Sequence, residues 1–180
     1  GKNFGSGLVQ GNDPIERAGY LTDLFGDEAV RTIETVRKGQ PLFMSLHFNA
    51  PHWPWEGPED RAVSDTLGDI FHRDGGNLAT YKKMVEAMDA NVAKLLAALD
   101  RMGMRENTIV VFTSDNGGER FSETWPFVGV KGELLEGGIR VPILMQWPGK
   151  IAAGSRSEQV MMSMDFLPSL LAMAGKAPGA

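Results

Sequence analysis

The chain has 180 residues, the size of about one domain, and its 42% hydrophobic and 23% charged residues are typical of a globular protein. Its net charge of −5 and the lack of any basic run argue against a nucleic-acid partner. No apolar stretch approaches the roughly 18 residues of a membrane span, and the first residues lack the apolar core of a signal peptide. The absence of cysteine excludes disulfides, thiolate metal sites and a cysteine nucleophile within these residues, and it leaves the compartment open.

The first half of the chain predicts two helices separated by a buried strand. Residues 1–19 are glycine-rich and polar, so we expect an irregular segment. Apolar residues recur at helical spacing over 23–38, with Thr22 or Asp23 as the cap. The apolar run over 41–48 predicts a strand buried on both faces. The strongest helical pattern follows between Asn77, a suitable N-cap, and Gly103.

The second half predicts two strands and a short helix. The β-branched run over 107–115 ends abruptly in a polar Gly-Gly loop, which is typical of a strand followed by a turn. In the apolar run over 139–147, Pro142 requires that the strand begin after it or lie at an edge. Asp165 can cap a last helix that ends at Gly175. The alternation over 20–180 predicts an α/β fold with a mostly parallel sheet flanked by helices, as one domain or as part of a larger one.

Polar residues follow two of the predicted strands, where open α/β sheets bind ligands. Asp115 and Asn116 are adjacent oxygen donors that suit a hard cation such as Ca²⁺ or Mg²⁺, although Asp-Asn-Gly-Gly is also an ordinary turn. His52 lies between Pro51 and Pro54 and could transfer a proton; the alternative is a hydrogen-bonded surface histidine.

Three other groups of charged or titratable residues have plainer interpretations. Lys131 could direct a positive charge at an anionic substrate, or it could be a solvated surface lysine. Arg140 and Glu136 are expected to form a structural ion pair. We assign His47 and His72 structural or incidental roles.

Four segments in order closely resemble the sulfatase family of the alkaline-phosphatase-like superfamily: APHWP at 50–54, FTSDNGG at 112–118, KGELLEGGIRVP at 131–142 and MDFLPSLLAMAG at 164–175. The resemblance implies a sulfuric ester hydrolase. It implies that Asp115 and Asn116 are Ca²⁺ ligands, that His52 protonates the departing alcohol, and that Lys131 binds the sulfate or the leaving oxygen. The substrate would be a sulfated small molecule or carbohydrate.

Sulfatases of this family use a formylglycine made in a C/S-x-P-x-R motif, which these residues do not contain. The family's earlier acidic metal ligands and Lys-x-His element are also missing, so the chain is similar to the C-terminal part of a sulfatase. We therefore expect the 180 residues alone to be inactive, with the formylglycine in a preceding region. Such enzymes are often periplasmic, secreted or lysosomal; compartment and oligomeric state stay open here.

Three alternatives remain. A phosphodiesterase or phosphonate monoester hydrolase of the same superfamily would share the metal residues. The chain could be a non-catalytic module that binds a glycan with Trp53 and Trp55. An excised structural fragment would be prone to associate. Residues 56–77, including His72, are expected to shape the pocket for the alcohol half of the ester, which the sequence does not identify.

Overall fold

A computed structural model describes residues 7–66 and 75–176. His72 and part of the stretch expected to shape the alcohol pocket lie outside the described residues. The chain forms two compact units, Gly1–Pro148 and Gly149–Ala180. Among the described residues, no helix is both long and apolar enough to cross a membrane.

The N-terminal segment is not irregular throughout, contrary to the prediction. Strands β1 (Leu8–Gln10) and β2 (Asp13–Ile15) pair antiparallel, with Leu8 opposite Ile15. Gly11 adopts φ +64 in the two-residue turn between them, a conformation that glycine reaches without the steric cost of a Cβ. Short strands such as these give too little periodicity to be recognised among glycines and polar residues.

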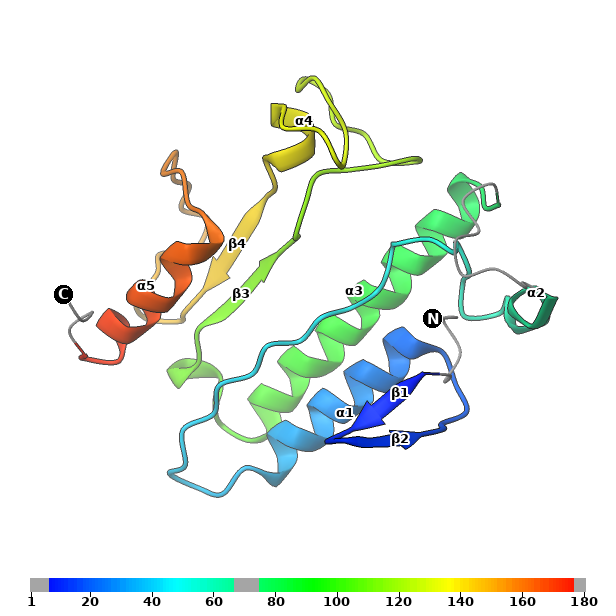
Figure 1. Ribbon diagram of the computed structural model, residues 1–180. Helices are drawn as coiled ribbons and strands as arrows, with labels where there is room; N and C mark the ends of the chain where they lie inside the picture. The colour runs from blue at the N-terminus through cyan, green and yellow to red at the C-terminus, as the bar shows by residue number, and fades with distance from the viewer. Residues whose placement is uncertain (1–6, 67–74, 177–180) are drawn as a thin grey trace. The chain divides into compact units, whose positions relative to one another are not determined.

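Two helices form the centre of the first unit (Figure 1). Helix α1 (Leu21–Thr35) begins after Tyr20, which makes no side-chain cap hydrogen bond, so the predicted capping by Thr22 or Asp23 is wrong. Helix α3 (Leu78–Arg101) confirms the prediction closely. Asn77 caps it by accepting a hydrogen bond from the Thr80 N–H, and Gly103 follows its end with φ +63.

The interface between α1 and α3 has an apolar cluster towards the C-terminal ends of the two helices and charged pairs at its rim. Ile33, Ala98 and Leu99 form a buried cluster, against which partly buried residues such as Met44 and Val110 pack. Two ion pairs bridge the helices at the surface, Lys94 with Asp27 and Arg101 with Glu34. The helices are therefore held by apolar burial, while the exposed pairs add little.

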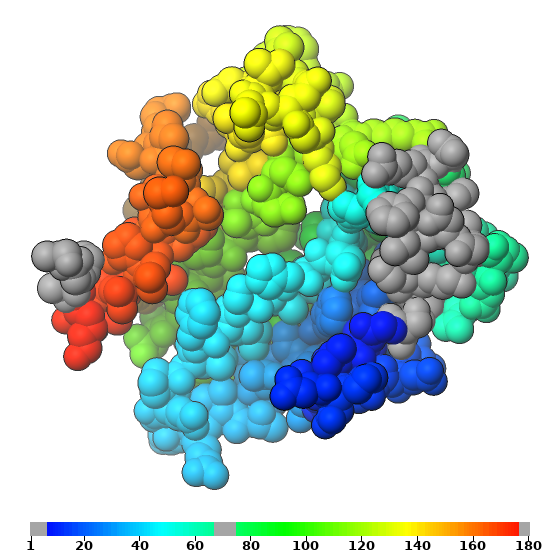
Figure 2. All heavy atoms as spheres, in the orientation of Figure 1, coloured from blue at the N-terminus to red at the C-terminus, as the bar shows by residue number. Residues whose placement is uncertain are grey.

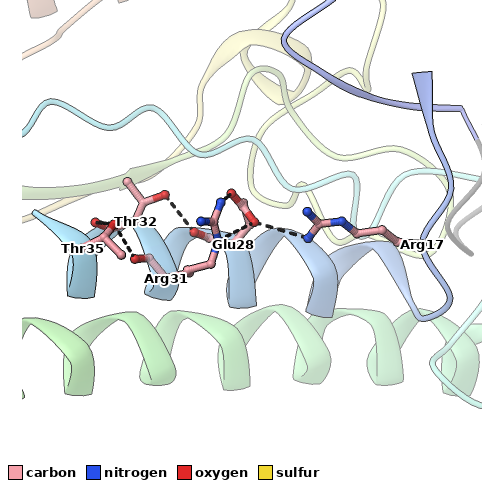
Figure 3. Close-up of polar contacts among 5 residues, drawn as sticks. All are labelled: Arg17, Glu28, Arg31, Thr32 and Thr35. Carbon is pink, nitrogen blue, oxygen red and sulfur yellow. Dashed lines mark hydrogen bonds and ion pairs between the residues drawn. The ribbon is translucent and has the colours of Figure 1, made fainter. Parts of the chain in front are cut away.

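A further charged group lies along the outer face of α1 (Figure 3). Glu28 accepts hydrogen bonds from Arg31, one turn later on the same helix, and from Arg17 before the helix. The hydrogen bond from Arg31, followed by the charges of both arginines, lowers the pKa of the Glu28 carboxyl below its ordinary value. This group ties the segment before α1 to the helix.

Residues 41–48 are extended but do not form the predicted strand. Met44, Leu46 and Phe48 are half-buried while Phe43, Ser45 and His47 are exposed, so only one face is covered. The segment runs alongside α3 in Figure 1 and lies at the surface, in light blue and cyan, in Figure 2. A strand needs a neighbour to bond its backbone, and none of the described strands pairs with this segment.

Strands β3 (Val110–Thr113) and β4 (Ile143–Gln146) confirm the positions of the other two predicted strands, but they pair antiparallel. The mostly parallel sheet is therefore not seen in the described part of the chain. The connection between β3 and β4 contains the four-residue helix α4 (Glu136–Ile139). Strand β4 begins directly after Pro142, as expected.

Two short elements flank α3 along the chain. The helix α2 (Arg61–Thr66) precedes α3, and the 3₁₀ turn η1 (Arg105–Asn107) follows α3.

The second unit contains the 3₁₀ turn η2 (Ser163–Asp165) and helix α5 (Phe166–Met173). Asp165 does not cap α5 with its side chain; its carboxylate instead accepts a 2.7 Å hydrogen bond from the Met162 N–H, which fixes η2. Gly175 follows the helix with φ +74, as predicted for its end.

Candidate active site

His52 lies in a tight turn that follows the extended segment. Its backbone N–H donates a 2.8 Å hydrogen bond to the Asn49 carbonyl, and its ring Nδ1 lies 2.7 Å from the Trp53 carbonyl oxygen. A carbonyl oxygen can only accept, so Nδ1 carries a proton. In the neutral ring Nε2 is then the basic nitrogen. Because the side chain is exposed, Nε2 is the atom placed to exchange a proton with a substrate.

The aromatic residues beside His52 are packed rather than presented to solvent. Trp55 is only 6% exposed and meets the Phe121 ring edge-on at 5.0 Å. The Arg120 guanidinium lies over both rings, 5.2 Å and 4.8 Å from their centroids. A glycan platform built from both Trp53 and Trp55 is therefore contradicted, since Trp55 has almost no accessible face.

Glycines bring the loop after β3 against the chain around α4. Gly117 donates a 2.8 Å hydrogen bond to the Gly138 carbonyl, and Gly137 donates one of the same length to the Val128 carbonyl. A Cβ on Gly117 would lie 1.9 Å from the Gly137 oxygen, and one on Gly137 would lie 2.1 Å from the Gly129 oxygen. Both Gly-Gly pairs thus allow a close approach of backbone to backbone.

This packing places Lys131 beside the same loop. Its backbone N–H donates a 2.8 Å hydrogen bond to the Gly118 carbonyl, and its ammonium lies 3.8 Å from the Glu119 carboxylate. The Lys131 side chain is 28% exposed, so it is a half-buried group and not the solvated surface lysine of the alternative interpretation. Lys131 is attached to the loop of Asp115 and Asn116 both through its backbone and through its charge.

Asp115 and Asn116 retain oxygen atoms that could bind a cation. The exposed Asp115 carboxylate makes no hydrogen bond or ion pair with any described residue. The Asn116 amide nitrogen donates to the Gly117 carbonyl, and its backbone carbonyl accepts from the Ser114 hydroxyl. Within residues 7–66 and 75–176, no three His, Cys, Asp or Glu side chains gather as a metal site. The two oxygen donors fit part of a Ca²⁺ site, which needs about six.

Arg140 and Glu136 form the expected structural ion pair, 2.9 Å apart, and Arg140 also lies over the Phe127 ring at 4.5 Å. Outside the site, the exposed His47 ring contacts the Ser45 hydroxyl at 2.8 Å. These contacts agree with the structural or incidental roles assigned to them.

The family model for sulfatases matches residues 3–176 of this chain. The chain belongs to the sulfatase family. It is 30% identical over 169 residues to the uncharacterized sulfatase YdeN of Escherichia coli K12, covering 91% of this chain and 29% of that protein. It is 33% identical over 165 residues to N-acetylgalactosamine-6-sulfatase of Mus musculus, covering 88% of this chain and 30% of that protein.

A solved structure shows the same fold. The crystal structure of Ps i-CgsB in complex with k-i-k-neocarrahexaose superposes with a TM-score of 0.82 and 34% identity, covering 96% of this chain and 38% of that chain. The chain thus spans about a third of the length of the sulfatases it matches.

The structure brings together some of the predicted sulfatase site residues and not others. Lys131 joins the loop of Asp115 and Asn116 directly, as described above. The turn of His52 approaches the same loop through Trp55 and Phe121. In the described part of the chain, the His52 ring makes no hydrogen bond or ion pair with Lys131 or Asp115.

Sequence reasoning missed the residues that fix this loop of the sulfatase chain. Glu119 pairs with Lys131, and the Ser122 hydroxyl lies 2.7 Å from the Tyr81 hydroxyl on α3. Phe121 adopts φ +71, which is uncommon for a residue with a side chain. Glu119 and Ser122 carried no recognisable signal, because a single polar residue in a loop follows no period. Tyr81 packs against the buried cluster of Trp55 and Met84, and its hydroxyl connects that cluster to the loop.

Proposed function

We propose that this chain carries one half of the active site of a sulfatase, a hydrolase of sulfate esters. The observation that carries the proposal is the double attachment of Lys131 to the loop of Asp115 and Asn116. That attachment brings a cationic side chain to the loop that carries two oxygen donors, which suits an enzyme that binds an anionic sulfate ester and a metal ion. Membership of the sulfatase family supports the reaction class.

Each proposed role follows from the chemistry of the group. Lys131 would bind a sulfate oxygen or the leaving oxygen with its ammonium. In its imidazolium form, His52 would donate the Nε2 proton to the departing alcohol and return to the neutral ring, whose remaining proton is held on Nδ1 by the Trp53 carbonyl. Asp115 and Asn116 would hold Ca²⁺, which when bound neutralises charge on the sulfate oxygens. The remaining ligands and a formylglycine nucleophile would come from a part of the enzyme outside these 180 residues.

The proposed substrate is a sulfated carbohydrate. The support is the similarity to an N-acetylgalactosamine-6-sulfatase and to a structure solved with neocarrahexaose.

The fold of the full-length enzyme would contain a larger, mostly parallel sheet. The support is that segment 41–48 is covered on one face only and that β3 pairs only with β4 among the described strands. Segment 41–48 and β3 would both be strands of that sheet.

The test is hydrolysis by a full-length enzyme that contains this chain. Aryl sulfates and sulfated oligosaccharides should be cleaved, and His52→Ala or Lys131→Ala should lower kcat by about 10²- to 10⁴-fold. His47→Ala is the matched control, because this exposed histidine contacts Ser45 outside the site. Much faster cleavage of phosphonates than of sulfates would replace the sulfatase assignment with the phosphonate hydrolase alternative.

The isolated chain offers a second, independent test. Without a nucleophile it should show no turnover, and Ca²⁺ should bind only weakly because the chain supplies about two of six ligands. NMR titration with CaCl₂ should shift the amide signals of Asp115 and Asn116 first. Shifts that survive in Asp115→Ala would show that the cation binds elsewhere.

A further inference from the structure

The Lys131 ammonium and the Glu119 carboxylate form an ion pair without a hydrogen bond. At 3.8 Å the two groups attract each other as charges, yet the distance is too long for a hydrogen bond. No described residue accepts a hydrogen bond from the Lys131 ammonium. The carboxylate therefore limits where the flexible lysine side chain can lie, while all three N–H donors stay available to another acceptor.

Glu119 can act in this way because its own position is fixed. Its carbonyl accepts a 3.0 Å hydrogen bond from the Ser122 N–H, and the Ser122 hydroxyl contacts the Tyr81 hydroxyl on α3. Between them, Phe121 packs on Trp55. One residue earlier, the Gly118 carbonyl accepts from the Lys131 N–H. The carboxylate thus extends from a loop that is anchored to the long helix and to the lysine backbone.

We propose that Glu119 is a positioning residue for Lys131, which holds the ammonium in line for a sulfate oxygen. The inference rests on the proposed function of Lys131. Glu119 also places a negative charge near the bound sulfate, so it should weaken the binding of free sulfate while it aligns the lysine. Removing it should therefore affect turnover and anion affinity in opposite directions.

The first experiment uses the 180-residue chain and needs no activity. Reductive ¹³C-methylation of the lysines gives each ammonium a methyl NMR signal, and Lys131→Arg identifies the signal of Lys131. Glu119→Gln should move this signal to the position of an exposed lysine, and Glu119→Asp should restore part of the difference. The matched control is Glu136→Gln, which breaks the nearby pair with Arg140 and should leave the Lys131 signal unchanged. An unchanged signal in Glu119→Gln would overturn the proposal.

The second experiment uses the full-length enzyme. Glu119→Gln should lower kcat by about 10- to 100-fold. It should also make inorganic sulfate a better competitive inhibitor by several-fold, and Glu119→Asp should recover part of both effects. A merely structural role would weaken turnover and sulfate binding together, which would also overturn the proposal.

Variants of the full-length enzyme distinguish the role of Lys131 from that of Glu119. Full activity of Lys131→Ala would remove the proposed function of the lysine itself. The other outcome is that Lys131→Ala is inactive while Glu119→Gln matches the wild type in kcat and in sulfate inhibition. That result would keep the proposed function of Lys131 and overturn only the positioning role of Glu119.

Discussion

Gly26 on α1 lies directly against Asn91 on α3, since a Cβ on Gly26 would be 2.1 Å from the Asn91 Oδ1. Asn91 is fully buried and its amide nitrogen donates 2.7 Å and 2.8 Å hydrogen bonds to the Asp23 carboxylate and the Ala87 carbonyl. We expect Gly26→Ala to lower the free energy of unfolding by about 1–3 kcal/mol, because the methyl group overpacks the contact. Urea denaturation, followed by circular dichroism, measures this change in the free energy of unfolding.

The matched control is to measure the effect of Gly26→Ala again in a protein that already carries Asn91→Ala. Asn91→Ala removes the Oδ1 and Cγ atoms, which lie 2.1 Å and 2.6 Å from the added Cβ, and leaves only the Cβ at 2.8 Å. Adding Gly26→Ala in this background should therefore lower the free energy of unfolding by less than it does in the wild type, because helix propensity offsets part of the smaller overlap. The same loss in both backgrounds would show that Asn91 is not the cause.

The glycine packing around the site predicts a larger effect for Gly137 than for Gly132. Gly137→Ala places its methyl group against the Gly129 carbonyl backbone, which cannot rotate away as a side chain can. We expect loss of hydrogen-exchange protection at the Gly137 and Lys131 amides, whose acceptors are Val128 and Gly118. Gly132→Ala, with φ +91 and nothing within 4 Å, should cost only the backbone strain of about 1–2 kcal/mol.

The neutral form of His52 should carry its proton on Nδ1. Long-range ¹H–¹⁵N spectra at high pH should show Nδ1 as the protonated nitrogen and Nε2 as the unprotonated one, because the Trp53 carbonyl accepts from Nδ1. His52→Ala assigns the signals. The opposite tautomer would mean that Nε2 is not the free basic atom, and the proposed proton donor would lose its support.

Tyr20 should make the fold sensitive to alkali. Its hydroxyl donates a 2.9 Å hydrogen bond to the Glu56 carbonyl, and burial raises its pKa to about 12. A raised folded-state pKa contributes stability that is complete below the unfolded value near 10 and is lost as the pH rises toward 12. Absorbance at 295 nm should show this late ionisation, and Tyr20→Phe should abolish it. Ionisation of Tyr20 near pH 10 in the folded chain would refute the prediction.

Glu28 should respond to acid in the opposite direction. The lowered pKa of its carboxyl gives stability that is present above its ordinary value of 4.5 and is lost as the pH falls through the folded-state value. NMR titration should find that Arg31→Ala raises the Glu28 pKa more than Arg17→Ala does, because the hydrogen bond from Arg31 is the largest cause. The reverse order would assign the main contact to Arg17.

Local patterns predicted the elements that depend on local interactions. The helix from Leu78 to Arg101 and its Asn77 cap follow from periodicity and a hydrogen bond three residues away. The start of β4 after Pro142 follows from a missing N–H. The segment 41–48 failed as a strand because a strand depends on a neighbour that its own sequence does not specify.

The sequence likewise predicted the site residues that belong to local motifs and missed those defined by long-range contacts. Asp115, Asn116, His52 and Lys131 were found because recognisable motifs contain them, and the structure places Lys131 against the loop of the first two. Glu119 and Ser122 could not be found, because their importance lies in contacts with residues that are distant along the chain, Lys131 and Tyr81. Long-range contacts of this kind leave no local pattern.

Helix α3 has 24 residues and is therefore about 36 Å long. Near its start Met84 belongs to the cluster with Trp55, and near its end Ala98 and Leu99 belong to the cluster with Ile33. Because one uninterrupted helix supplies both clusters, neither can melt without taking turns of helix from the other. Loss of the Tyr81–Ser122 contact on heating should coincide with loss of the α1–α3 core in a single cooperative transition, so the loop of the proposed site and the core share one melting temperature.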